Sequence, residues 1–197
     1  MSILDRIYVK FFVPSGFAYA AYLKRCALLH HQGDNCFISK SANLPDPYLT
    51  SIGNNVWITS GCQLLCHDAS VVMINFIFDQ RYDRVGPIIL NDNVFLGNNV
   101  IILPNITIGS NVIVGAGAVV TKNVPDNTIW AGNPARMLCT FQDYVHKIEA
   151  QTANYPWASL LTQKKTPGFD PILEQRLKIE RSTFFFGQSG SKSNKDD

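Results

Sequence analysis

The sequence predicts an all-β solenoid, a coil of short stacked strands with helices before and after it. Three observations predict this fold. An aliphatic residue recurs every six positions, a second small or branched apolar residue stands two positions before it, and asparagine or glycine falls between the strands. Each six-residue unit gives one short strand and one corner, and it buries its inward face only by stacking on neighbouring units. The 197 residues, 46% of them apolar, suit one compact domain of this kind.

The repeat is most regular over residues 90–124. The leading aliphatic residues are Leu90, Leu96, Ile102, Ile108, Val114 and Val120, and the second inward set is Val94, Val100, Ile106, Val112, Ala118 and Val124. The expected corner residues are Asn93, Asn99, Asn105, Asn111, Gly117 and Asn123. Asparagine and glycine tolerate the left-handed backbone that a tight corner needs. The inner wall and the corners of the coil are therefore both readable from the spacing.

Earlier hexads extend the coil toward the N-terminus. Leading residues there are Ile38, Leu44, Ile52, Ile58 and Leu64. Cys36 and Cys62 occupy inward positions, where a small thiol is a filler of the core rather than a metal ligand. Two residues are inserted between Leu44 and Ile52, near Pro45–Pro47.

The flanks lack the repeat. Helices are expected at Ser2–Phe12 and Gly16–Leu29, with Ser15 as N-cap of the second. A helical extension is expected over 136–186, and its last helix begins with Asp170 as N-cap and Pro171. The predicted organisation is a helical region 1–30, a β-helix 31–135, the extension 136–186 and a disordered tail 187–197.

The repeat breaks just after Leu64. His67 falls on a corner position and Asp68 on an inward one, where a carboxylate is costly, so we expect the backbone to leave the coil here. The phase returns at Ile88–Leu90, which makes about 69–87 an excluded loop. A long loop in a tight repeat is often functional, although an unrelated surface insertion is the alternative.

Among the four histidines, only His67 stands at a repeat break beside a loop. Imidazole titrates near neutral pH and serves as a general base, so His67 is the predicted catalytic residue. A structural histidine is the alternative. Asp68 is the candidate to orient or polarise it.

The composition limits which partners and which cellular compartment are expected. Lys+Arg 17 against Asp+Glu 15 gives a net charge of +2, without the basic excess of a nucleic-acid-binding domain. Five scattered cysteines favour a reducing compartment, and neither a signal peptide nor a spanning helix is predicted, so the expected location is cytoplasmic. Basic residues beside aromatic ones near the N-terminus leave a peripheral membrane contact open.

The hexads, the histidine before the excluded loop and the stretch VGAGAVVTKNVPDNTIWAGNPARML resemble the hexapeptide-repeat acyltransferases over about residues 33–140. The most similar branch contains the maltose, galactoside and nodulation-type O-acetyltransferases and their relatives in capsule and lipopolysaccharide synthesis. The resemblance implies a left-handed parallel β-helix, a homotrimer with active sites between subunits, acetyl-CoA as co-substrate, a sugar or glycan acceptor and no metal.

The resemblance also implies roles for single residues. His67 would take the proton of an acceptor hydroxyl, which attacks the thioester directly without an acyl-enzyme. The coenzyme contacts would fall to Asn98, Ala116, Thr121, Lys122 and Arg136. Surface charge is the alternative reading of the last two. The family's corner tryptophan is Phe95 here, and Trp57 fills the equivalent place one stretch earlier.

Three other functions remain open. The first is N-acetylation of an amino-sugar nucleotide on the same scaffold, and the second is a non-catalytic β-helix scaffold. The third is a zinc enzyme similar to the trimeric carbonic anhydrases, which needs three histidines, whereas the coil region contains only His67.

Overall fold

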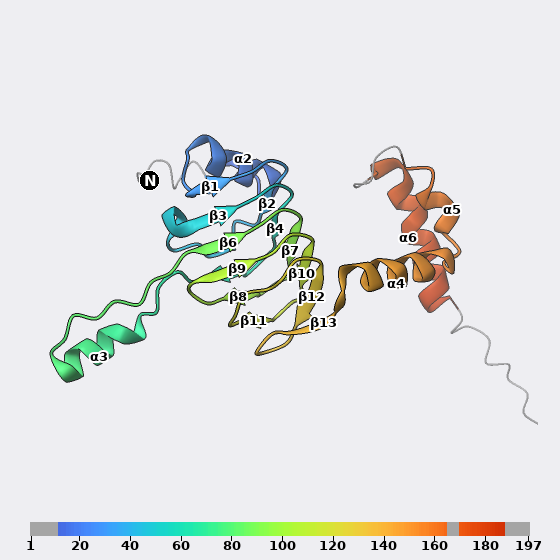
Figure 1. Cartoon of the computed structure of the whole chain (residues 1–197). Helices are drawn as coiled ribbons and strands as arrows, with labels where there is room; N and C mark the ends of the chain where they lie inside the picture. The colour runs from blue at the N-terminus through green and yellow to red at the C-terminus, as the bar shows by residue number, and fades with distance from the viewer. Residues whose placement is uncertain (1–11, 165–169, 188–197) are drawn as a thin grey trace, which may run out of the picture. The chain divides into compact units, whose positions relative to one another are not determined.

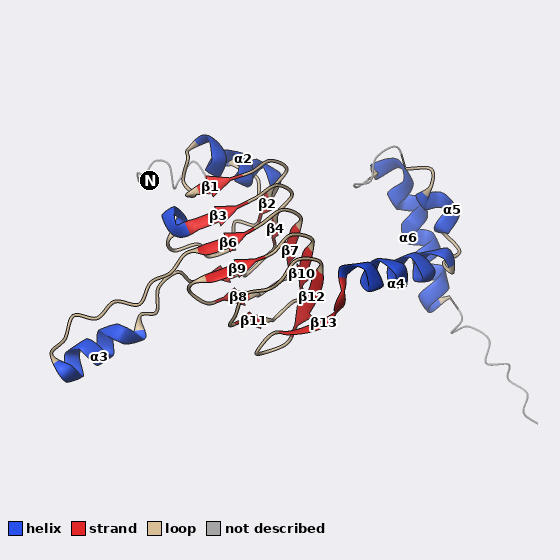
Figure 2. Cartoon of the chain, viewed as in Figure 1, coloured by secondary structure: helices blue, strands red, loops and turns tan. Residues whose placement is uncertain are grey.

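A computed structural model describes residues 12–164 and 170–187 of the chain. The chain divides into two compact units, Met1–Tyr144 and Val145–Asp197. The described part of the first unit contains all the strands and two short α-helices, whereas the described part of the second unit is helical (Figure 1, Figure 2).

Three sheets form the sides of the coil, and the chain visits them in rotation (Figure 1). The first contains β1 (His31–Gln32), β3 (Thr50–Ile52), β6 (Ile88–Leu90) and β9 (Ile106–Ile108). The second contains β2 (Phe37–Ile38), β4 (Trp57–Ile58), β7 (Val94–Leu96), β10 (Val112–Val114), β12 (Thr128–Ala131) and β13 (Arg136–Thr140). The third contains β5 (Gln63–Leu64), β8 (Ile101–Ile102) and β11 (Val119–Val120). All pairs are parallel except β12–β13, and Leu90 is aligned with Ile108, three hexads later. The predicted stack of short parallel strands is confirmed.

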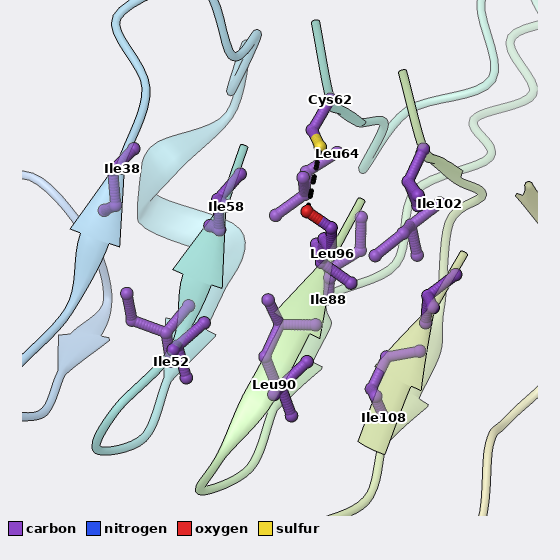
Figure 3. Close-up of a cluster of buried hydrophobic side chains, with 14 of the residues drawn as sticks. Ile38, Ile52, Ile58, Cys62, Leu64, Ile88, Leu90, Leu96, Ile102 and Ile108 are labelled. Carbon is purple, nitrogen blue, oxygen red and sulfur yellow. Dashed lines mark hydrogen bonds between the residues drawn. The ribbon is translucent and has the colours of Figure 1, made fainter. Parts of the chain in front are cut away.

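Inward-facing aliphatic residues, most of them the leading residues of the hexads, fill the inside of the coil (Figure 3). Ile38, Ile52, Ile58, Leu64, Ile88, Leu96, Ile102 and Ile108 are completely buried. Cys62 lies among them, with its Sγ 3.9 Å from the Leu96 carbonyl oxygen, and burial raises the pKa of its thiol. Cys36 is also buried, so the prediction that both are small inward residues is confirmed. Burial of each large aliphatic side chain contributes about 1.5–3 kcal/mol.

Asparagines make the corners between the first and second sheets. Asn55, Asn93, Asn111 and Asn127 all have a positive φ, between 54° and 58°. Their side chains form a ladder along the coil: Asn55 Nδ2 donates to Asn93 Oδ1 (3.0 Å), Asn93 to Asn111 (2.9 Å) and Asn111 to Asn127 (2.9 Å). The prediction for Asn123 is wrong, because the left-handed corner falls at Asn127 and Asn123 Oδ1 instead accepts from the backbone N–H of Thr107.

The N-terminal end of the coil carries α2 (Phe17–Arg25), shorter than the expected helix Gly16–Leu29. It ends early because the chain turns at Ala27, whose φ is 46°. Gly16, not Ser15, precedes the helix, and the Ser15 hydroxyl accepts from the Lys40 N–H. Of the expected helix Ser2–Phe12, all but Phe12 lies outside the described residues.

The excluded loop leaves and returns through one narrow stem. His67 and Val85 form an antiparallel bridge, Asp68 N–H donates to the Arg84 carbonyl (2.9 Å), and Gly86 N–H donates to that of Cys66 (2.9 Å). The predicted departure after Leu64 and return at β6 are confirmed. Between the two stem segments lies a helix that was not predicted, α3 (Ser70–Phe78), which points away from the coil (Figure 1).

The second unit has a small core of its own. Its helices are α4 (Phe141–Ala153), which begins in the first unit, α5 (Ala158–Leu161) and α6 (Pro171–Phe186). Trp157, Leu160, Leu173 and Leu177 form the core. Asp170 Oδ1 accepts from the N–H groups of Ile172 and Leu173, which confirms the predicted N-cap. Phe184 packs edge-on against Trp157, with ring centroids 5.5 Å apart.

The start of the expected helical extension is corrected. Residues 136–140 form strand β13 and not a helix, because they pair with β12 and satisfy the backbone groups of that strand. Except for Gly187, the tail expected to be disordered lies outside the described residues. Within the ranges described, no helix has the length and apolar character needed to cross a membrane.

Candidate active site

His67 lies where the third sheet turns toward the first, at the base of the excluded loop. Its side chain is 39% exposed, and its Nδ1 lies 2.7 Å from Oδ2 of Asp46. A carboxylate only accepts hydrogen bonds, so this contact assigns the proton of a neutral imidazole to Nδ1. Among the described residues, Nε2 has no hydrogen-bond partner, and its lone pair is therefore available to a proton.

Asp46 was not predicted. It belongs to the insertion between Leu44 and Ile52 and precedes the 3-10 turn η1 (Pro47–Leu49). The coils are aligned here by the bridge between Asn43 and Gln63, which places the insertion beside the chain that leads into His67. A carboxylate between two prolines, one coil before the histidine, is the sequence signal that could have identified it.

Asp68 is directed elsewhere. Its Oδ1 accepts from the Ser70 N–H (3.0 Å), and its Oδ2 lies 3.2 Å from the Arg84 guanidinium. Hydrogen bonds from Ser70, with a smaller contribution from Arg84, hold the pKa of Asp68 below its usual value. Adjacent residues of an extended segment point to opposite sides, so His67 faces Asp46 while Asp68 faces the loop. The contact with His67 that was expected of Asp68 is therefore made by Asp46.

Two of the expected coenzyme residues share one corner of the third sheet. Asn98 and Ala116 follow β7 and β10, and the Gly117 N–H donates to the Asn98 carbonyl (2.8 Å). The coils approach closely here. A Cβ added to Gly97 would lie 2.6 Å from the Ala116 nitrogen, which is closer than real contacts allow. Only glycine permits this packing.

Thr121 and Lys122 lie at the opposite edge of the third sheet. Leu64, Ile102 and Val120 are aligned in register, so these two residues share a corner with His67, two coils further on. That separation is roughly 10 Å along the coil, from the spacing of neighbouring strands. The Lys122 ammonium lies 5.4 Å from the centroid of the Trp130 ring, a cation–π contact.

The outward face of the third sheet lies between these two corners. Gln63, Ile101 and Val119 are aligned on it, one in each coil. Val119 accepts from the Ala135 N–H (2.8 Å), which brings the turn before Arg136 to the end of this face. Arg136 itself donates to the Ala135 carbonyl (2.9 Å). The structure therefore gathers all five expected coenzyme residues around the ends and edges of one face.

The second sheet carries the aromatic positions. Trp57 and Phe95 are register partners on β4 and β7, which confirms that Trp57 fills the equivalent place one coil earlier. With Ile113 and Phe141 they line an apolar hollow of about 360 Å³. Across residues 12–164 and 170–187, no three His, Cys, Asp or Glu side chains are grouped as metal ligands would be.

Comparison with known proteins agrees with the geometry. Residues 87–122 match the family model "Bacterial transferase hexapeptide (six repeats)". Protein CapG of Staphylococcus aureus is 45% identical over 150 residues, which cover 73% of this chain and 84% of CapG.

Two solved structures share the fold. One is a hexapeptide-repeat acetyltransferase of Vibrio cholerae with acetyl coenzyme A (23% identity, TM-score 0.51, 68% of this chain and 82% of that one). The other is a galactoside acetyltransferase with coenzyme A (22% identity, TM-score 0.53, 72% and 81%).

A coil of six-residue repeats interrupted by a histidine-bearing corner defines a class, the hexapeptide-repeat transferases. The match over the repeats and the extensive identity to CapG place this protein in that class. The chain belongs to the bacterial hexapeptide transferase family.

Proposed function

We propose that the protein transfers the acetyl group of acetyl-CoA to a hydroxyl of a sugar or glycan in the synthesis of a surface polysaccharide, capsule or lipopolysaccharide. The observation that carries the proposal is the His67 corner. Nδ1 of its imidazole contacts Asp46, and Nε2 is available to take a proton. The third-sheet face lies directly beside the ring, and the cations Lys122 and Arg136 lie toward the far end of that face.

The basic residues at the edge and end of the third-sheet face support a coenzyme site there. Acetyl-CoA supplies an acetyl group already activated as a thioester. Asn98 and the closely packed backbone at Ala116 would hold the pantetheine arm, while Thr121, Lys122 and Arg136 would contact phosphate groups. Lys122 and Arg136 lie further along the coil than His67. The acyl end of the coenzyme, which is remote from its phosphates, would therefore lie toward His67.

His67 acts as a general base in this proposal. Nε2 takes the proton of the acceptor hydroxyl as its oxygen bonds to the acetyl carbon. The carbon–sulfur bond breaks, and the proton passes to the departing thiolate sulfur. The transfer is direct, without an acyl-enzyme, and a base of this kind contributes about 10²–10⁴-fold to the rate.

The assembly follows the family resemblance. We take the coil to be left-handed and the active form to be a homotrimer, with each His67 in a cleft between two subunits. The exposed apolar side chains of α3, among them Phe76 at 87% exposure, support an assembled form because they would be covered there.

The experiment combines the purified protein, acetyl-CoA and a panel of glycans, with the products identified by mass spectrometry. We expect one added acetyl group that mild alkali removes, as it removes an ester. An alkali-stable acetyl group on an amino sugar would favour N-acetylation instead. Absence of acetyl-CoA binding by calorimetry would favour a non-catalytic scaffold.

A further inference from the structure

We infer that Asp46 is a positioning residue that fixes the proton of His67 on Nδ1 and thereby keeps Nε2 as the base. This inference rests on the proposed function. The relevant contact joins Asp46 Oδ2 and His67 Nδ1 at 2.7 Å, at the short end for a charge-assisted hydrogen bond. The Asp46 side chain is 17% exposed and that of His67 39%, so the carboxylate is the more enclosed partner.

The hydrogen bond decides which nitrogen can act. An ionised carboxylate has no proton to donate, so the imidazole must donate from Nδ1. The lone pair then resides on Nε2, on the opposite side of the ring. An imidazole without this partner can carry its proton on either nitrogen, and it can also rotate about its side-chain bonds.

The turn that carries Asp46 is rigid. Pro45 and Pro47 flank it, and each proline ring fixes one backbone φ angle. The Asp46 carbonyl oxygen accepts from the Leu49 N–H (3.0 Å) and from the Thr50 hydroxyl (3.3 Å). These bonds hold the Asp46 backbone in place independently of the contact between its carboxylate and His67.

The histidine side of the pair is anchored to the same turn. Cys66 precedes His67 and is completely buried. Its Sγ lies 3.8 Å from the Thr50 hydroxyl and 4.0 Å from the Asp46 carbonyl oxygen. The backbone positions of Asp46 and His67 are thus set by shared buried neighbours, which is the support that a defined ring orientation requires.

The neighbouring carboxylate does not compete for the imidazole. Asp68 is occupied by Ser70 and Arg84, and within the described ranges the carboxylate that contacts His67 is that of Asp46. The net contribution of one such hydrogen bond to folding is small beside that of the core, so replacing the Asp46 carboxylate by an amide should leave the fold intact.

The test measures the tautomer and the kinetics together. Nitrogen-15 NMR at mildly alkaline pH reports which ring nitrogen of His67 carries the proton, with His67→Ala identifying the signals. We expect the Nδ1–H form in the wild-type protein. Asp46→Asn should shift it toward the Nε2–H form, because the amide N–H₂ can donate to Nδ1.

The same Asp46→Asn protein should lose about 100-fold or more in kcat, the scale of general-base catalysis, with KM for acetyl-CoA unchanged. Asp46→Glu should recover part of that loss, since it restores the carboxylate. Asp34→Asn is the matched control: it removes a carboxylate from an exposed ion pair with Lys24 and should leave both readouts as in the wild type.

Two results would overturn the inference: a wild-type His67 protonated on Nε2, or an Asp46→Asn protein with wild-type kcat while His67→Ala is inactive. If the Asp46→Asn protein does not fold, the position of the His67 proton in the wild-type protein decides the inference by itself. Wild-type turnover by His67→Ala would instead reject the proposed function, and the inference with it.

Discussion

Buried thiols are the most directly testable single residues of the coil. Burial raises the pKa of Cys36, Cys62 and Cys66, so these thiols stay protonated at pH 8, where the reactive thiolate is scarce. We expect Cys26, which is exposed, to react with a maleimide within minutes, and the three buried thiols only on unfolding. Mass spectrometry of labelled peptides checks this, with Cys26→Ser as control.

The same pKa shifts set a pH dependence of stability. A raised folded-state pKa means that the folded chain binds more protons than the unfolded chain at alkaline pH. The contribution of these thiols is therefore complete below the ordinary value of 9.0 and is lost as pH rises through the higher folded value. Rapid labelling of Cys62 in the folded protein would contradict the burial on which both expectations rest.

At the residue scale, the sequence identifies the histidine but not its partner. His67 is conspicuous because it breaks a strong repeat. Asp46 is not, because its contact depends on how an inserted turn lies against the next coil, a long-range alignment that spacing does not encode. The adjacent Asp68 was the natural candidate, and the alternation of side chains along an extended chain directs it away.

At the element scale, the corners can be tested through Asn111. Its φ is 55°, and its side chain donates to Asn127 in the ladder. Asn111→Gly keeps the left-handed backbone but removes the ladder bonds, whereas Asn111→Ala also strains the backbone by about 1–2 kcal/mol. Urea denaturation should therefore show Asn111→Ala as the less stable variant, by about that amount. Equal stability of the two variants would contradict the role of the left-handed corner.

The elements differ in how far periodicity predicts them. The strands from β6 to β11 follow the hexads because each inward residue is needed to fill the same narrow interior. Helix α3 was not predicted because its own apolar side chains are spread around the whole helix. It lacks the one-sided apolar stripe that marks a helix on a globular surface. Asn123 was misplaced because the last coil is irregular, and no local residue announces where its corner moves.

At the scale of the whole molecule, assembly is the first expectation. The apolar side chains of α3 are exposed in the single chain. We expect analytical ultracentrifugation at micromolar concentration to give three times the chain mass of 22.0 kDa. A monomer with full transferase activity would show that the site is complete within one chain.

The central claim is that His67 removes a proton from the acceptor. The hexapeptide coil, the corner that carries His67 and the third-sheet face with Lys122 and Arg136 support it. The most direct measurement is the turnover of His67→Ala at saturating acetyl-CoA, with coenzyme affinity measured by calorimetry on the same protein. His31→Ala serves as control, since that imidazole is exposed on β1, at the N-terminal end of the first sheet. The account predicts a fall in kcat of about 10²–10⁴-fold with unchanged acetyl-CoA affinity. Turnover within a few-fold of the wild type would contradict it.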